Sequence, residues 1–272
     1  MDNAFERLGA GRRLLKRLVT DPVGNHLPAP WLKGLLRLGK SDLAAANWAD
    51  PGGWRSMVIS YDGAPTQIAD KILVHGGTLS MALRNRLRLA SDLLARLINT
   101  AEPPVHALCL GAGPGCIILR AMARADVPCE ATLVDLNADA FAYGRDLARG
   151  YGLSDRVRYV RGDVRDVGKM LDSPPSVVKM IGICEYLDDA QIVEIATRLA
   201  DVLPPGAPIV MNNITHRHGS DRFCRRVLGL HMYHRSVEQL AALMTMAGFG
   251  RFSVHDEPLG VYSVIVGYRL EA

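Results

Sequence analysis

The sequence lacks several features that would assign it to a special class of protein. It contains no run of about 18 uninterrupted apolar residues, the length at which a helix spans a bilayer, so we expect no membrane segment. Its five cysteines are scattered and form no C-x-x-C pair, which predicts reduced thiols in the cytoplasm rather than a disulfide framework or a zinc knuckle. The N-terminus has no apolar stretch followed by a small-residue cleavage site, and we do not interpret it as a signal peptide.

Two phosphate-binding patterns are also missing. A dinucleotide fold needs G-x-G-x-x-G after its first strand, and Cys116 stands where the third glycine would be. The G-x-x-x-x-G-K-[ST] loop that cradles a nucleoside triphosphate is absent as well. These absences argue against a pyrophosphate or a triphosphate as the ligand.

The most informative segment present is VHALCLGAGPG, Val105 to Gly115, in which an apolar stretch leads directly into three glycines. The apolar part is typical of a buried parallel strand, and the glycines remove side chains that would keep a ligand away from the backbone. Further on, ATLVDLNADA places Asp135 at the end of a second apolar strand, where nucleotide-binding folds keep a carboxylate for ribose hydroxyls. Each feature also has a simpler explanation. The glycines could form a tight turn without a ligand, and Asp135 could serve to begin a helix. Taken together, the two segments predict a nucleoside cofactor.

These residues resemble the first motif of the class I S-adenosylmethionine-dependent methyltransferases, an acidic residue and a spacer followed by G-x-G-x-G. Cys109 stands at the acidic position, which departs from that pattern, so backbone contacts from the glycine turn would have to hold more of the cofactor. The resemblance continues in order through Asp135, then Gly162 and Asp163 of YVRGDV, and then VVKMIGICEYLDD as the fourth strand and its turn. It covers roughly residues 105 to 213.

The resemblance implies S-adenosyl-L-methionine as the cofactor and an α/β fold with a doubly wound, seven-stranded sheet. It implies that the glycine turn shapes the methionine site, that Asp135 holds the ribose and that Asp163 faces adenine. The residues that it assigns to cofactor binding are Gly111, Ala112, Gly113, Gly115, Asp135, Leu136, Asp163, Val164 and Ile183.

Periodicity divides the chain into a helical N-terminal region, residues 1–103, and an alternating region, residues 104–272. Leucines at helical spacing predict helices in the first region, the longest over 79–98, and prolines and glycines separate them. In the second region, apolar runs alternating with helical stretches predict a doubly wound parallel sheet. Its strands are expected near 105–110, 130–135, 156–161, 177–183 and 207–213. Two β-rich stretches within 251–270 predict a closing hairpin with an antiparallel last strand.

The turns after the fourth and fifth strands should bind the methyl acceptor, because ligands of open α/β sheets bind outside the carboxyl ends of the strands. Glu185 is the candidate catalytic residue, since its carboxylate could hold an amine and remove its proton; it could equally favour the start of the following helix through its charge. Tyr186, Asn213 and His216 are candidate substrate residues, although an amide such as Asn213 could also bond local backbone. Tyr61 joins them from WRSMVISYDGAP, which reads as a loop that closes on the substrate or packs on the core.

The combined prediction is a cytoplasmic methyltransferase that acts on a small polar molecule, with an amine or amino-acid-like acceptor favoured by Glu185. The N-terminal helices are expected to form a lid or an oligomer contact, such as that of a homodimer. No metal is expected, because His216 and His218 have no acidic partner motif.

Three alternatives stay open. An RNA methyltransferase is favoured by the excess of basic residues in 1–40, but the net charge of only +4 and the absence of a recognised RNA-binding module argue against a nucleic-acid partner. Transfer of the aminocarboxypropyl or aminopropyl arm of the same cofactor needs the same fold. A degenerate scaffold that binds the cofactor without turnover is favoured by Cys109.

Overall fold

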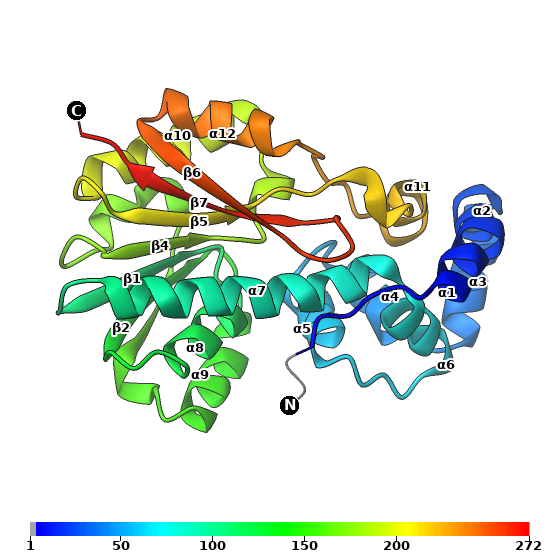
Figure 1. Cartoon of the computed structure of the whole chain (residues 1–272). Coiled ribbons are helices and arrows are strands. Elements are labelled where there is room, and N and C mark those ends of the chain that lie inside the picture. The colour runs from blue at the N-terminus through cyan, green and yellow to red at the C-terminus, as the bar shows by residue number, and fades with distance from the viewer. Residues whose placement is uncertain (1–3, 272) are drawn as a thin grey trace. The chain divides into compact units, whose positions relative to one another are not determined.

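The computed structural model describes residues 4–271, and Figure 1 traces them. They fall into two compact units, each assembled from more than one stretch of the chain. Unit 1 consists of the chain up to Arg86 with Thr215–Met232 and Asp256–Tyr262; unit 2 consists of Leu87–Ile214, Tyr233–His255 and the chain from Ser263 onward. The boundary after Arg86 falls inside helix α7 (Thr78–Thr100). These units differ from the division at residue 103 that the sequence suggested, because two C-terminal segments join the N-terminal helices.

Unit 2 is built on a seven-stranded sheet in the order β3-β2-β1-β4-β5-β7-β6. Strands β1 to β5 pair in parallel, and β7 pairs antiparallel with β5, which confirms the predicted fold class and the antiparallel last strand. The strands are β1 Val105–Leu110, β2 Cys129–Asp135, β3 Val157–Arg161, β4 Val177–Met180, β5 Pro208–Asn212, β6 Phe249–Asp256 and β7 Ser263–Arg269. The strand order reverses between β1 and β4, and the carboxyl ends at such a reversal are where open α/β sheets bind ligands.

Helices cover both faces of this sheet, with α10 and α12 on one face and α8 and α9 on the other (Figure 1). They are α8 Cys116–Met122, α9 Ala140–Gly150, α10 Asp189–Val202 and α12 Val237–Met246. The buried cluster that includes residues of α10 and α12 also contains Leu110 of β1 and Met180 of β4. Because side chains alternate along a strand, Cys109 and Lys179 point to the opposite face of the sheet.

Local sequence explains where α10 and α12 begin. Asp188 accepts a hydrogen bond from the Gln191 amide at 2.8 Å, and the Gln191 side chain accepts one from the Asp188 amide at 2.9 Å. Ser236 and Gln239 make the same reciprocal pair at the start of α12. Each capping box satisfies two backbone amides that the helix itself leaves unpaired. Three short 3₁₀ turns complete the connections of unit 2: η3 Ser154–Arg156, η4 Val164–Lys169 and η5 Cys184–Tyr186.

Unit 1 is helical, as the sequence predicted for the N-terminal region. Its first segment contains α1 Ala10–Leu15, η1 Lys16–Thr20, α2 Asp21–His26, α3 Ala29–Leu38, α4 Asp42–Ala49, α5 Trp54–Asp62, α6 Ile68–Asp70, η2 Lys71–Gly76 and the start of α7. The segment from Thr215 adds η6 His216–His218, α11 Asp221–Phe223 and η7 Cys224–Leu228.

The expectation of a loop over WRSMVISYDGAP was wrong, since most of this segment forms α5. The helix buries Ser56 and Ser60, which are four residues apart and share one face. Trp54, Met57, Val58 and Tyr61 also have the i, i+3, i+4, i+7 spacing of one helix face, so the sequence did carry a helix signal, which the loop interpretation overlooked. Gly63 ends the helix in a left-handed conformation with φ of +66°.

Hydrogen bonds between distant residues hold the segments of unit 1 together. The Trp48 indole donates to the Val227 carbonyl at 2.7 Å, and Arg226 donates to the carbonyls of Asn25 and Leu27 at 2.6 and 2.9 Å. The buried Arg86 guanidinium lies 4.5 Å from the centre of the Tyr262 ring. Residues near the two ends of the chain therefore depend on each other for their packing.

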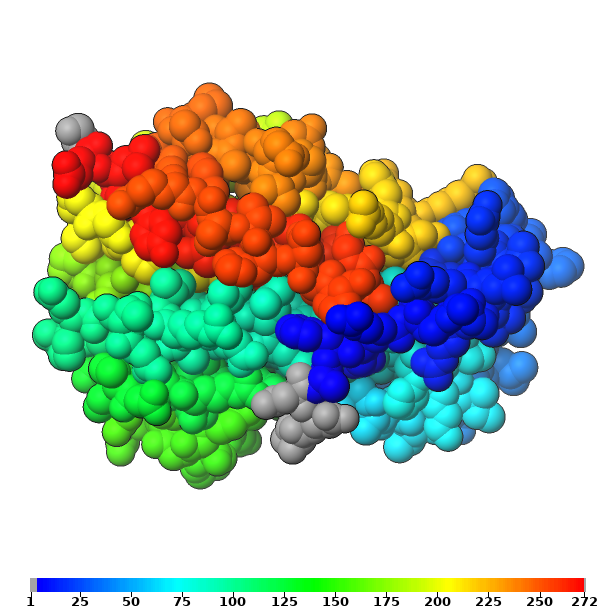
Figure 2. Space-filling view, viewed as in Figure 1, coloured from blue at the N-terminus to red at the C-terminus, as the bar shows by residue number. Residues whose placement is uncertain are grey.

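The first helices of unit 1, blue in Figure 2, carry several exposed large apolar side chains. On α3, Trp31, Leu35 and Leu38 follow one another at helical spacing with 69, 59 and 82% of their surface exposed. Within residues 4–271, no helix is both long and apolar enough to cross a membrane.

Candidate functional site

The glycine turn after β1 has a backbone shape that requires glycine. Gly111, Gly113 and Gly115 all have positive φ, at +54, +51 and +83°. A Cβ on Gly111 would lie 1.9 Å from Cγ2 of Ile183, and a Cβ on Gly115 would lie 2.4 Å from Cδ2 of Leu133. The turn therefore brings bare backbone to the carboxyl end of the sheet, and Gly115 leads directly into α8.

Asp135, at the end of β2, faces this turn. Its Oδ2 accepts a hydrogen bond from the Gly113 amide at 2.7 Å, and its Oδ1 accepts one from the Asn137 amide at 2.9 Å. Each carboxylate oxygen keeps a second lone pair for a further donor. Asp135 thus combines a structural role in fixing the turn with free acceptor capacity beside it.

Apolar side chains lie next to this carboxylate in sequence. Leu136 has 65% of its surface exposed, which is unusual for a leucine that directly follows a buried strand, while Val164 and Ile183 are half-buried. Asp163 is held by Arg165, which donates to it from its backbone amide at 2.9 Å and from its guanidinium at 3.0 and 2.5 Å. These bonds lower the pKa of Asp163 to about 2, so its carboxylate is charged at neutral pH.

Cys109 and Lys179 are register partners on β1 and β4. Only 1 and 4% of their surfaces are exposed. The Lys179 ammonium approaches the carbonyls of Leu110 and Gly111 at 3.5 and 3.4 Å, so it lies directly below the glycine turn. Burial raises the pKa of the Cys109 thiol, although the nearby Lys179 acts in the opposite direction.

The predicted catalytic residue, Glu185, lies in the turn after β4 and has only 4% of its surface exposed. Asn212, at the end of β5, donates to its carboxylate at 3.4 Å and accepts a hydrogen bond from the Gly182 amide at 2.8 Å. Arg235 holds the same turn through the carbonyls of Cys184 and Leu187, at 2.8 and 2.7 Å. The Glu185 carboxylate is therefore set in a rigid environment.

The other predicted substrate residues occupy different environments. Tyr186 follows Glu185 and is half-buried. The Asn213 amide is buried, donates to the Arg235 carbonyl at 3.0 Å and accepts from the Ser263 amide at 2.8 Å. Asn213 therefore bonds backbone, which was the alternative role, but its partners lie 22 and 50 residues away in the sequence rather than locally. Both residues belong to unit 2, as does Glu185.

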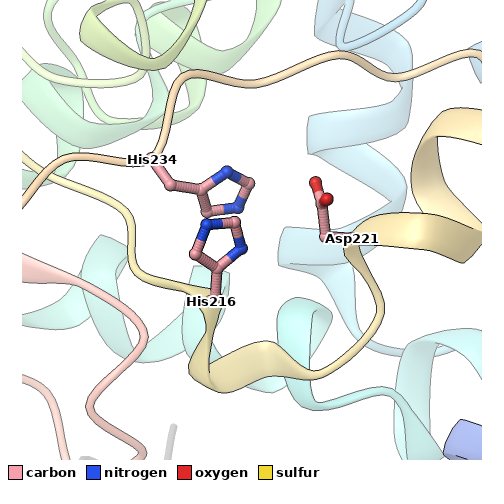
Figure 3. A group of neighbouring side chains, drawn as sticks. All are labelled: His216, Asp221 and His234. Carbon is pink, nitrogen blue, oxygen red and sulfur yellow. The ribbon is translucent and has the colours of Figure 1, made fainter.

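Tyr61 and His216 belong to unit 1 instead. The Tyr61 hydroxyl accepts a hydrogen bond from Arg86 at 3.2 Å, and His216 is exposed in the short turn η6. Figure 3 draws His216 and Asp221 of unit 1 with His234 of unit 2, three side chains of the kinds that ligate metals. Within either unit alone, residues 4–271 hold no group of three such ligands. That no metal is used stays a prediction.

A polar cavity of about 270 Å³ lies at the opposite, amino ends of β1 to β3. His106, Thr132 and Arg158 are among its lining residues. His106 accepts from or donates to the Thr132 hydroxyl at 3.0 Å through Nε2, and burial lowers its pKa below 6.5. The cavity is separate from the glycine turn, which follows the other end of β1.

The sequence analysis missed three residues that shape this region: Lys179, Asn212 and Arg235. A signal existed only for Lys179, a single charged residue inside the apolar run VVKMI. Asn212 reaches Glu185, 27 residues away, and Arg235 reaches Cys184, 51 residues away. Such pairs leave no pattern in a single sequence.

Comparisons with known proteins identify the fold and the family. Residues 107–206 match the family described as a methyltransferase domain, which includes the glycine turn, Asp135, Asp163 and Glu185. No curated protein sequence matches the chain. A structure from Bordetella parapertussis, described as a possible exported protein, is similar with a TM-score of 0.68 and 17% identity, over 80% of this chain and 79% of that one.

Two similar structures are named methyltransferases. Mitomycin 7-O-methyltransferase MmcR has a TM-score of 0.55 and 20% identity, over 95% of this chain and 83% of that one. The N,N-8-amino-8-demethyl-D-riboflavin dimethyltransferase RosA from Streptomyces davawensis has a TM-score of 0.52 and 19% identity, over 84% of this chain and 70% of that one. At these identities the likeness supports the fold, and the matching domain family supplies the activity and implies S-adenosylmethionine as the cofactor. Residues 107–206 therefore belong to a methyltransferase domain family, and the sheet around them has the class I methyltransferase fold.

Proposed function

We propose that this protein binds S-adenosylmethionine at the carboxyl ends of β1 and β2 and transfers its methyl group to a small polar molecule. The observation that carries the proposal is the Asp135 carboxylate, which bonds the Gly113 amide at 2.7 Å and is followed by the exposed Leu136. A nucleoside joined to an amino acid needs acceptors for ribose hydroxyls, an apolar surface for the base, and open backbone for the amino acid. This edge of the sheet offers all three.

The residues present fit that cofactor. The free lone pairs of Asp135 would accept from the ribose hydroxyls, and Leu136, Val164 and Ile183 would flank adenine. The charged Asp163 would meet the adenine edge while Arg165 keeps it in position. Gly111, Ala112, Gly113 and Gly115 would surround the methionine part.

S-adenosylmethionine supplies a methyl group on a positively charged sulfonium, which is already a good leaving group. The protein therefore has to align the acceptor atom with the methyl group and exclude water. Glu185 would hold the acceptor and take its proton if the acceptor reacts from a protonated form. The Asn212 amide, which bonds the carboxylate at 3.4 Å, would keep it in one orientation.

A small-molecule acceptor is supported by the names of the two similar methyltransferases, which modify a mitomycin and a riboflavin derivative. Tyr61, Tyr186, Asn213 and His216 remain proposed substrate residues. A cytoplasmic location is supported by the five free cysteines, and a homodimer formed through unit 1 is supported by the exposed apolar stripe of α3.

Calorimetric titration of the purified protein tests the cofactor. We expect binding of S-adenosylmethionine and S-adenosylhomocysteine with dissociation constants in the micromolar range, and no binding of NAD. Binding of NAD, or of none of the three, would contradict the proposal. Product analysis then separates the reactions, since methyl transfer leaves S-adenosylhomocysteine and transfer of the aminopropyl or aminocarboxypropyl arm leaves methylthioadenosine.

A further inference from the structure

Lys179 is a charged residue in the most buried part of the sheet. It lies on β4, whose four residues are all buried, between the register partners Cys109 on β1 and Val210 on β5. Only 4% of its surface is exposed. Moving an ammonium group out of water costs several kcal/mol unless an anion or several good hydrogen bonds replace the water.

The surroundings of Lys179 offer little compensation. Its hydrogen bonds to the carbonyls of Leu110 and Gly111 measure 3.5 and 3.4 Å, which is long for a charged donor, and its other partner is the Cys109 thiol. None of the ion pairs found among residues 4–271 involves Lys179. Burial raises the pKa of the Cys109 thiol, so the nearest titratable side chain across the strand pair is neutral at pH 7. The cation therefore lies below the glycine turn without an ion-pair partner among residues 4–271.

We propose that the Lys179 ammonium binds the methionine carboxylate of S-adenosylmethionine and that this contact selects cofactors with an intact amino-acid end. The inference rests on the proposed function, because it concerns the same cofactor. The carboxylate is the only anionic group of S-adenosylmethionine, and the glycine turn above Lys179 is the part of the site with open backbone. Bringing the carboxylate to Lys179 would neutralise both charges in a setting of low dielectric constant, where such a pair is strong.

The residue at position 109 explains why the charge of Lys179 is available to bind a ligand. An aspartate at that position, as in the family pattern, would lie beside Lys179 in the strand register and would neutralise it within the protein. Cys109 cannot do so, so the positive charge stays available to the ligand. This end of the sheet thus carries a cation at position 179, whereas the family pattern carries an anion at position 109. It would hold the cofactor by its carboxylate rather than by its amino group.

The test compares ligands that have the carboxylate with ligands that lack it. Lys179→Met replaces the ammonium by an apolar side chain of similar length. Lys169→Met is the matched control, because Lys169 is exposed and pairs only with Asp166 on the surface. Each protein is titrated by calorimetry with S-adenosylhomocysteine, with decarboxylated S-adenosylmethionine and with methylthioadenosine, and its thermal unfolding is recorded without ligand.

For Lys179→Met we expect a loss of affinity for S-adenosylhomocysteine of about 10- to 100-fold, the range for a hydrogen bond to a charged group. Affinities for methylthioadenosine and for the decarboxylated cofactor should stay within about twofold, since neither ligand carries the carboxylate. The unfolding temperature without ligand should not fall, because replacing an uncompensated buried charge by an apolar group is neutral or stabilising. Lys169→Met should behave as the wild type.

Two results would overturn the assignment. If Lys179→Met binds S-adenosylhomocysteine as the wild type does, the ammonium does not contact the carboxylate. If it loses methylthioadenosine equally and unfolds at lower temperature, Lys179 supports the turn instead of the ligand. Failure of the wild type to bind any adenosyl compound is a different outcome, which refutes the proposed function itself.

Discussion

Replacing Asp135 by alanine should weaken the binding of every ligand that carries the ribose. The carboxylate accepts two hydrogen bonds within the protein, from the amides of Gly113 at 2.7 Å and Asn137 at 2.9 Å. In the complex it would also accept hydrogen bonds from the ribose hydroxyls. A hydrogen bond to a charged group contributes about 1.5–3 kcal/mol, so we expect affinity to fall by about 10- to 150-fold. The loss of the bond to Gly113 should also loosen the glycine turn. The fall in affinity should therefore lie near the upper end of the 10- to 150-fold range.

Calorimetric titration with S-adenosylhomocysteine and methylthioadenosine measures this effect. Both ligands carry the ribose, so both should weaken together, in contrast to the selective effect expected at Lys179. Asp139→Ala is a suitable control, because Asp139 is exposed and its side chain makes no capping hydrogen bond to α9. Unchanged affinity in a folded Asp135→Ala protein would refute the placement of the ribose beside β2.

Three further predictions concern the turns and the pH dependence. Gly111→Ala should destabilise the protein by about 1–3 kcal/mol in urea unfolding, because its Cβ would lie 1.9 Å from Ile183 at a φ of +54°; equal stability would contradict this geometry. Glu185→Gln should lower kcat by about 10²- to 10⁴-fold while affinity for S-adenosylhomocysteine stays unchanged, and an unaltered kcat would exclude it as the base. Burial lowers the pKa of His106 below 6.5, so the unfolded chain binds more protons and stability is lost as pH falls from 6.5. His106→Gln should therefore flatten the fall of Tm below pH 6.5, and a parallel curve would show that His106 does not cause it.

The strands of unit 2 could be predicted because each is a short apolar run that ends in a distinctive residue. Gly111 follows β1, and Asp135 ends β2, and both lie at the sheet edge where the sequence placed them. Parallel strands buried on both faces leave this continuous apolar signal. The position of Gly111 and Asp135 at this edge was therefore visible in the sequence, while their binding of the cofactor stays a proposal.

The rest could not be predicted because it depends on contacts between distant residues. The α5 helix is a different case, because Trp54, Met57, Val58 and Tyr61 have helical spacing in the sequence and this signal was overlooked. The membership of Thr215–Met232 in unit 1 depends on bonds such as that from Trp48 to Val227, which no local pattern announces. The sequence does not indicate whether the Asn213 amide bonds a ligand or backbone, and in the structure it bonds backbone.

The discontinuous make-up of unit 1 has a consequence for how the chain matures on the ribosome. Its helices up to Arg86 need Thr215–Met232 and Asp256–Tyr262 to complete their packing, and both segments are synthesised well after Arg86. At about 5–20 residues per second, Tyr262 is synthesised about 9 to 35 seconds after Arg86. During that interval the earliest helices lack the carbonyl of Val227 and the ring of Tyr262 as partners. Unit 1, whose first segment precedes the sheet in the chain, is therefore completed only after the strands β1 to β6 have been synthesised.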